Sequence, residues 1–184
     1  MVTVKNAFRS AFILSALLSL LLAGCAKRPG IKVVSTLTPP AETEFAYVVP
    51  FVTTLVPDSF DEATFNEFID TLNASRGTTP VNTFLILKEE LKEVDPAWLE
   101  KQLYITGEIW SYIENSGCCS TELRVKGRVQ IFEPGRKSPA VEIFVPLDSF
   151  FEHDYSKLSV ERDKLSRRLA RELANQSIKA LTVR

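Results

Sequence analysis

Three stretches in the middle of the chain alternate between apolar and polar side chains. Aliphatic residues occupy alternate positions, with few interruptions, in 105–113, 123–131 and 141–145. Turn-forming sequences separate these stretches, Asn-Ser-Gly at 115–117 and Glu-Pro-Gly at 133–135. A period of two between polar turns predicts three antiparallel strands in a meander, with one apolar face and one wet face.

Apolar residues at helical spacing occur on both sides of this meander. Ser59 and Glu62 fit a capping box at the start of a helix that Gly77 is placed to end. A longer pattern from about Ser159 to Leu181 predicts a C-terminal helix that lies across the apolar face of the sheet. The apolar stripes consist of Phe65, Phe68, Ile69 and Leu72 in the first helix, and of Leu165, Leu169, Leu173, Ile178 and Leu181 in the second.

Shorter elements fill the remaining sequence. Phe45–Val52 and Asn82–Leu87 are rich in aromatic, β-branched and aliphatic residues and predict two further strands. Lys88–Val94 predicts a polar amphipathic turn or short helix. Asp-Pro at 95–96 fits an N-cap with proline in the first helical position, so Ala97–Leu103 is predicted to be helical.

This order of elements predicts the α+β class in two layers. We expect a mixed sheet that contains an antiparallel three-strand meander. It should pack against two main helices, one of which is the long C-terminal helix.

The N-terminus has a different character. Lys5 and Arg9 precede the twelve residues from Ala11 to Leu22, which are apolar except for two serines. A basic region, a short apolar core and a small-residue exit are the three parts of an export signal. Twelve residues of helix span about 18 Å against about 30 Å for a bilayer core, so a transmembrane helix is the poorer interpretation.

The apolar run ends in Leu-Ala-Gly-Cys at positions 22–25, which resembles the lipobox of bacterial lipoproteins. The resemblance implies cleavage before Cys25 and covalent lipid on that cysteine, with no other cofactor. The alternative is an ordinary secretory leader, or an unrelated apolar N-terminus, that ends in cysteine. In lipoproteins an acidic residue after the cysteine favours the inner membrane. Ala26 and Lys27 follow here, so we expect a lipid-anchored outer-membrane protein that faces the periplasm.

These signals divide the chain into three parts. Residues 1–24 are the predicted signal peptide, 25–43 a lipid-anchored flexible tether, and 44–184 a single periplasmic domain. As a flexible coil, the 18 residues after the cysteine would have an end-to-end distance of about 25 Å. The domain is therefore expected to stay close to its membrane.

Charge and motif content argue against several functions. The chain has 22 basic and 23 acidic side chains, and loss of the leader leaves 20 against 23, a net charge of −3. Nucleic-acid binding normally requires a basic excess, and the sequence has no glycine-rich phosphate loop. His153, the single histidine, lies between Glu152 and Asp154 and is more typical of a solvated loop than of a metal site or a catalytic base. We expect no enzyme, no catalytic residue and no metal.

Cys118 and Cys119 are adjacent, and Cys25 is unavailable to them if it carries lipid. Neighbouring Cα atoms lie about 3.8 Å apart across a trans peptide, below the usual minimum of about 4.4 Å for a disulfide. A bond between the two would close a strained eight-membered ring. Three states stay open: this vicinal disulfide, a bridge to a second subunit, and two free thiols.

The wet face of the meander is the candidate interaction surface. Arg124, Lys126 and Arg128 alternate along its middle strand. They would either bind an anionic glycan or lipid headgroup, or be neutralised across the strands by Glu108 and Glu142.

Large aromatic residues share this face in the predicted register. Trp110, Tyr112 and Phe144 would lie among the charged residues, which suggests a covering element or a partner subunit. We place a second apolar tract, Leu147–Tyr155, outside the regular elements, and Trp98 in the core.

The order of elements is similar to the anticodon-binding-like α/β fold shared by the CsgG curli-secretion lipoprotein, the PelC polysaccharide-export lipoprotein and the N-terminal domain of TolB. Three stretches carry the resemblance. Ala46–Phe51 is an apolar strand that ends in Pro-Phe, Phe84–Leu91 a strand before a charged short helix, and Tyr104–Ile109 a strand with Gly-x-Ile at its end. The curli channel also needs long membrane hairpins, for which this chain has no spare strands of about ten residues.

We therefore expect a non-enzymatic assembly or export component of the cell envelope. Its partners would be the membrane, through the lipid, and either another envelope protein or copies of itself in a collar like that of PelC. No nucleic acid or nucleotide is expected. The alternative is a monomeric adaptor or activator that binds another envelope protein or a glycan.

Overall fold

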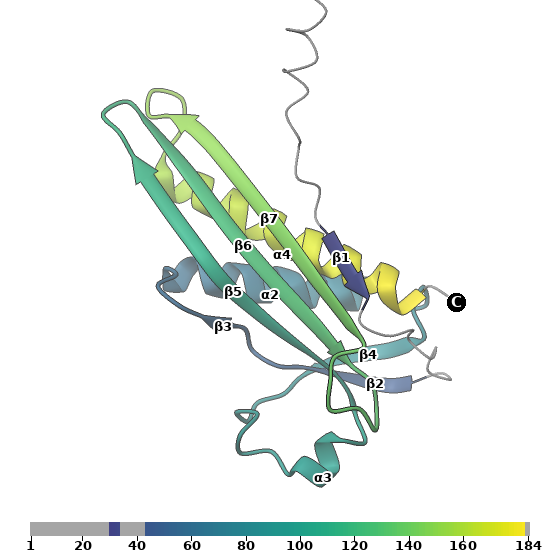
Figure 1. The fold of residues 1–184 in the computed structure, drawn as a ribbon. Helices are drawn as coiled ribbons and strands as arrows, with labels where there is room; N and C mark the ends of the chain where they lie inside the picture. The colour runs from purple at the N-terminus through teal and green to yellow at the C-terminus, as the bar shows by residue number, and fades with distance from the viewer. Residues whose placement is uncertain (1–29, 34–42, 183–184) are drawn as a thin grey trace, which may run out of the picture.

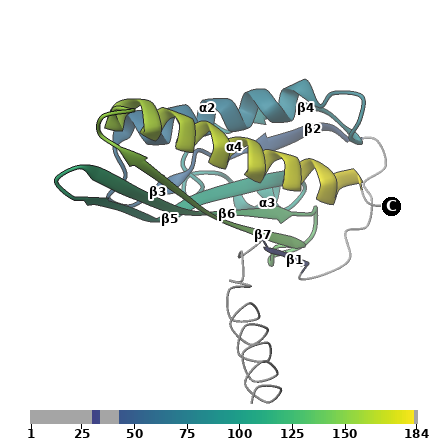
Figure 2. The same ribbon diagram turned by 90° about the horizontal axis from the view of Figure 1, so that it is seen from above.

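Two long helices cover one face of a mixed seven-stranded sheet (Figures 1 and 2). The computed structural model describes residues 30–33 and 43–182. The strands are β1 (Gly30–Val33), β2 (Thr43–Val48), β3 (Val52–Thr53), β4 (Val81–Ile86), β5 (Leu103–Ser116), β6 (Ser120–Phe132) and β7 (Val141–Glu152), and the helices are α2 (Asp58–Ala74), α3 (Pro96–Leu99) and α4 (Leu158–Thr182). The predicted α+β class in two layers is confirmed.

The sheet has the strand order β1-β7-β6-β5-β2-β4, and β3 pairs with residues 108–109 in the middle of β5. The predicted meander is formed by β5, β6 and β7, which are antiparallel. β2 runs parallel to both of its neighbours, β4 and β5, and β1 runs antiparallel to β7. The sheet therefore stays open, with β4 and β1 at its edges.

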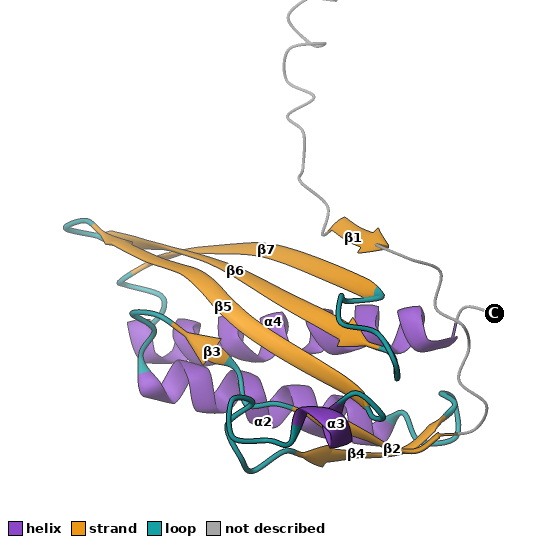
Figure 3. Cartoon of the chain, turned by 60° about the horizontal axis from the view of Figure 1, so that its bottom comes forward, coloured by secondary structure: helices purple, strands orange, loops and turns teal. Residues whose placement is uncertain are grey.

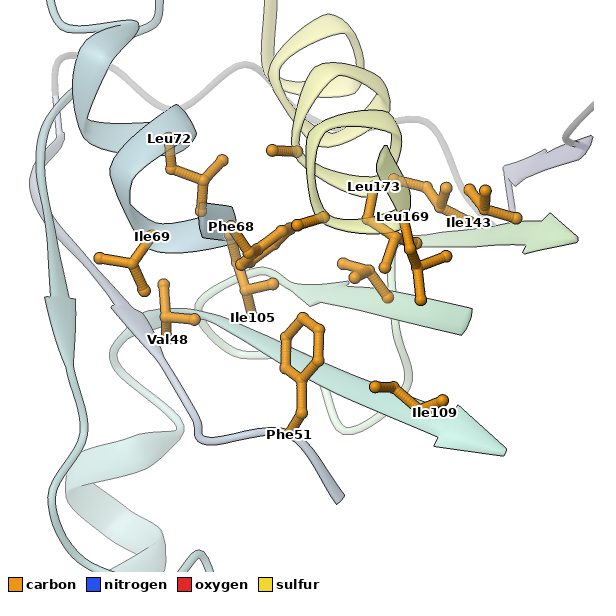
Figure 4. Close-up of a cluster of buried hydrophobic side chains, with 14 of the residues drawn as sticks. Val48, Phe51, Phe68, Ile69, Leu72, Ile105, Ile109, Ile143, Leu169 and Leu173 are labelled. Atoms are coloured by element: carbon orange, nitrogen blue, oxygen red, sulfur yellow. The ribbon is translucent and has the colours of Figure 1, made fainter. Parts of the chain in front are cut away.

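The core lies between the helix layer and the sheet (Figure 4). Phe68 and Leu72 of α2 and Leu169 and Leu173 of α4 are fully buried against the strands. The strand residues that meet them include Val48, Ile105, Ile109 and Ile143. The apolar faces predicted for both helices are thus the faces that pack on the sheet.

Helix α4 matches its predicted bounds, but both ends of α2 differ from the prediction. Pro57 is the N-cap of α2, and its carbonyl accepts hydrogen bonds from the N–H groups of Phe60 (2.8 Å) and Asp61 (3.1 Å). The capping box from Ser59 is therefore wrong, because Ser59 already lies within the first turn. At the other end, Ser75 closes the helix by donating its N–H and its hydroxyl to the carbonyl of Leu72, at 3.1 and 2.6 Å.

The short elements follow the predictions in part. Asp95 caps α3 as expected, since its Oδ1 accepts from the N–H of Ala97 at 2.9 Å, but the helix lasts only four residues. The single strand predicted for 45–52 is divided into β2 and β3. Gly77 has a φ of +82° in the turn that follows α2, rather than ending the helix itself.

Strand β1 occupies four residues of the segment 25–43 that was predicted to be a flexible tether. Gly30–Val33 pair with the free edge of β7, with Gly30 opposite Phe144 and Val33 opposite Val141. An unpaired strand edge offers such a segment backbone partners that its own sequence does not reveal. Cys25, the signal peptide and most of the tether lie outside the described residues. Within 30–33 and 43–182, no helix is long and apolar enough to cross a membrane.

Candidate functional site

The face of the meander opposite α2 and α4, called the outer face below, carries the candidate site (Figure 2). Toward β2 it is covered by a small apolar cluster of Val49, Leu87 and Val94. Trp98 packs against this cluster, with its ring edge-on to Tyr47 at 4.9 Å. Trp98 is therefore a packing residue, although of this smaller cluster rather than of the main core.

An ion-pair cluster crosses the middle of the outer face. Arg128 of β6 stands between Glu108 of β5 and Glu142 of β7, because cross-strand pairing sets Glu108 directly opposite Arg128. The guanidinium bonds Glu108 through Nη2, and its Nη1 lies 3.3 Å from Oε1 of Glu142. The Nε2 of Gln130 donates to the same Oε1 at 2.8 Å. The predicted neutralisation across the strands is confirmed for Arg128.

The two other basic residues of the row have different partners. Arg124 forms a bidentate pair with Glu122 of its own strand, with both N–O distances at 2.8 Å. The ammonium of Lys126 lies 4.9 Å from the centre of the Trp110 ring, a cation–π distance. Because Glu108, Glu122, Glu142 and Asp148 share this face, it has no basic excess, which weakens the interpretation as a site for an anionic ligand.

Tyr112 does not lie on the outer face, which corrects the prediction. The pairing of β5 with β6 shifts between Ile109 and Ser111, so Trp110 is an extra residue in a β-bulge. An extra residue reverses the alternation beyond it. Tyr112 therefore points to the helix side, with its ring 5.0 Å from that of Phe60, and Ile113 is 51% exposed instead of buried.

On the helix side, Tyr112 belongs to a polar cluster that ties the start of α4 to β5. Its hydroxyl donates to Oε2 of Glu114 at 2.8 Å, and Arg162 of α4 holds both oxygens of the same carboxylate at 2.7–3.0 Å. The hydrogen bond from Arg162 is the main cause that lowers the pKa of Glu114. Burial, with a smaller contribution from Glu114, raises the pKa of Tyr112 to about 12.

Two adjoining hollows on the outer face share Glu108 and Arg128. One, of about 290 Å³, is bordered by Trp110 and Phe144. The other, of about 410 Å³, extends toward Tyr104 and Phe132, whose rings stack at 4.5 Å. Aromatic rings, carboxylates, a guanidinium and an amide bind ligands by contact and hydrogen bonding, so this surface is suited to recognition.

The tract 147–155 also corrects the prediction, because β7 continues through Pro146 to Glu152. Among the described residues, β7 is paired on this side only at 141–144, by β1, and proline is tolerated where a strand lacks such a partner. Phe150 consequently lies on the outer face and is 65% exposed. Trp110, which is nearer the middle of the same face, is 45% exposed. The alternation of Leu147 and Phe151 with polar neighbours is the signal that would have extended this strand.

The β5–β6 turn projects beyond the helix layer (Figure 3). Cys118 and Cys119 lie in this turn, and both are exposed. His153, at the end of β7, pairs through Nε2 with the hydroxyl of Thr121 at 2.8 Å. Within the described ranges, no group of three or more His, Cys, Asp or Glu side chains is placed to hold a metal ion.

No protein-family model and no curated protein sequence matches the chain. Among solved structures, the PelC dodecamer from Paraburkholderia phytofirmans superposes with a TM-score of 0.57 at 13% identity, covering 85% of this chain and 99% of that one. Protein XCC0632 from Xanthomonas campestris, of the DUF330 family, gives a TM-score of 0.52 at 6% identity, covering 83% and 93%. At these identities the likeness concerns the fold alone. The chain has the fold of PelC, as the resemblance of its element order implied.

Proposed function

We propose that this chain is a lipoprotein of the bacterial outer membrane that faces the periplasm and serves as a non-enzymatic assembly or export component of the envelope. In this proposal Cys25 carries the lipid anchor, and copies of the domain associate with one another. The observation that carries the proposal is the similarity to a chain of the PelC dodecamer over nearly the full length of that chain. The lipobox-like sequence at 22–25 supplies the independent support for the anchor.

The position of β1 sharpens the anchoring proposal. Because Gly30 already belongs to the sheet, only residues 26–29 separate it from Cys25. Five residue steps of fully extended chain span at most about 18 Å. An acylated Cys25 would therefore hold the β1–β7 edge close to the membrane surface, with less freedom than a tether of 18 residues would allow.

The outer face supports association with a protein partner. Trp110, Ile113 and Phe150 are 45%, 51% and 65% exposed on one side of the meander, and charged residues surround them. Exposed aromatic residues within a polar rim are typical of protein interfaces. This surface would be covered in a homo-oligomer, and equally in the alternative, a monomeric adaptor that binds another envelope protein.

Cys25→Ser tests the anchor. The parent chain should be processed, incorporate labelled palmitate and remain with the outer membrane, whereas the variant should lose the label and leave the membrane fraction. Ala26→Ser, which changes the neighbouring residue and keeps the cysteine, is the matched control. Equal partitioning of parent and Cys25→Ser would refute the anchor.

A mass measurement of the detergent-extracted parent tests the assembly. A closed oligomer supports the collar, and a strictly monomeric protein removes it in favour of the adaptor. In the adaptor case, cross-linking in cells should capture a second envelope protein rather than another copy of the chain.

A further inference from the structure

The two residues at the end of the β5–β6 hairpin are both cysteines. The N–H of Gly117 donates to the carbonyl of Ser120 at 2.8 Å, and Ser116 pairs with Thr121, so Cys118 and Cys119 are the two loop residues. A second contact holds the loop from the side, because the N–H of His153 donates to the carbonyl of Cys119 at 2.9 Å. The loop backbone is therefore anchored on the hairpin and on the end of β7.

Turn propensity does not account for cysteine at these positions. Two-residue hairpin loops favour asparagine, aspartate and glycine, because the preferred turns need a positive φ. Leu55 is the one non-glycine residue with a positive φ in the described part of the chain, so neither cysteine adopts that conformation. The reactivity of the two thiols is the property of these side chains that turn formation does not use.

The thiols are placed to react with each other. Their Sγ atoms lie 3.0 Å apart, about 1 Å more than a disulfide bond, and both side chains are exposed to a macromolecular reagent. The contact with the Cys118 thiol raises the pKa of Cys119, which favours the neutral thiol of Cys119 over its thiolate. Adjacency in the chain gives each thiol a far higher effective concentration for the other than any second molecule can provide.

We propose that Cys118 and Cys119 form a redox-active vicinal pair that closes to a disulfide by exchange with a disulfide-bearing oxidant. The thiolate of one cysteine attacks a sulfur of the oxidant, forms a mixed disulfide and releases one oxidant thiolate. The second cysteine, after losing its proton, attacks the protein sulfur of the mixed disulfide. This closes the vicinal ring and releases the second oxidant thiolate. The two protons and two electrons of the pair thus leave on the reduced oxidant.

The short ring makes this disulfide labile. Adjacent Cα atoms lie closer together than an unstrained disulfide allows, and strained or exposed disulfides are the ones that open readily. The hairpin tip would therefore change between an open and a closed form under mild redox conditions. The proposal depends on the proposed function in one respect: acylation of Cys25 removes the third thiol that could compete for the pair.

The test uses the full chain, expressed with its leader and extracted from membranes after acid quenching and alkylation. Trypsin releases Gln102–Arg124, which contains both tip cysteines, no internal lysine or arginine, and not Cys25. Without reductant this peptide should be unalkylated and lighter than its dithiol form by two hydrogen atoms. A monothiol reductant, at a concentration that leaves structural disulfides intact, should convert it to the doubly alkylated form.

Two results would overturn the proposal: alkylation of both cysteines without reductant, or a covalent dimer linked through this peptide. Lipidation is read separately on the N-terminal peptide, so its failure is distinguishable from failure of the vicinal pair. Cys119→Ser should leave Cys118 unable to close the ring and should trap it as a mixed disulfide with the oxidant. Ser120→Ala, a matched change at the loop edge, should keep the vicinal bond, and equal melting temperatures would show that both variants fold.

Discussion

Gly107→Ala is expected to destabilise the domain, even though alanine is the better strand residue where space allows. An ideal Cβ at position 107 would lie 2.1 Å from Cε1 and 2.2 Å from Cδ1 of Phe51. The Phe51 ring has little room to move, because it packs 5.1 Å from the ring of Phe68 and 5.6 Å from that of Phe65. The substitution therefore forces a shift in the core beneath β5.

Two effects of opposite sign compete in this variant. Replacing a strand glycine by alanine gains about 0.5–1 kcal/mol in chain entropy. Overpacking a well-filled core costs about 1–3 kcal/mol, and a contact as short as that to Phe51 belongs at or above the upper end of that range. A net loss of about 2 kcal/mol follows, and in a domain of this size it lowers the melting temperature by roughly 4–8 °C.

Urea and thermal unfolding of the mature chain with Cys25→Ser measure this loss. Gly117→Ala is the matched control, because its Cβ would come no closer than 3.6 Å to the carbonyl oxygen of Ser120. The control should stay within about 0.5 kcal/mol of the parent. Replacing the Phe51 ring by a smaller side chain, in Phe51→Leu, should remove most of the loss in free energy of unfolding that Gly107→Ala causes. A Gly107→Ala variant as stable as the parent would refute the packing of Phe51 on β5.

Three further predictions concern other parts of the molecule. Arg162 lowers the pKa of Glu114 in the folded chain, so the ionised Glu114 stabilises the fold above its unfolded pKa, and this stabilisation is lost as the pH falls through the folded pKa. The stability of Glu114→Gln, measured by unfolding at a series of pH values, should lack this acid-side loss, and a pH profile identical to that of the parent would contradict the prediction. The side-chain amide of Asn73 accepts from the N–H of Phe84 at 3.1 Å and donates to its carbonyl at 3.2 Å, which occupies backbone groups of the edge strand β4. Asn73→Leu should therefore lower the free energy of unfolding by about 1–2 kcal/mol and increase self-association in light scattering, and an unaltered melting temperature would contradict this. Phe150→Ser should leave the free energy of unfolding within about 0.5 kcal/mol and weaken any oligomer in sedimentation, and an intact oligomer would remove Phe150 from the interface.

Long, strongly periodic segments of this chain were predictable, because a single buried face dictates their pattern. α4 follows from helical spacing over more than twenty residues and the meander from repeated alternation between turns. The row Arg124–Lys126–Arg128 was placed on the correct face because of that alternation. Short elements depend on tertiary context. Strand β1 exists because β7 offers an unpaired edge, and nothing in four residues announces such a partner.

The candidate site was predictable only up to the bulge. A period of two assigns each residue of β5 to a face by counting, and one extra residue at Trp110 invalidates the count for Tyr112 and Ile113. The third strand was also underestimated, because its predicted alternation covered only 141–145, whereas β7 continues through Pro146 to Glu152. The sequence thus located the outer face but misassigned the residues at its distal end.

Native mass spectrometry of the detergent-extracted protein tests the central proposal most directly. The account predicts a closed oligomer whose chains each begin at Cys25 and carry the additional mass of acyl lipid. A monomer in which Cys25 is unmodified would contradict it.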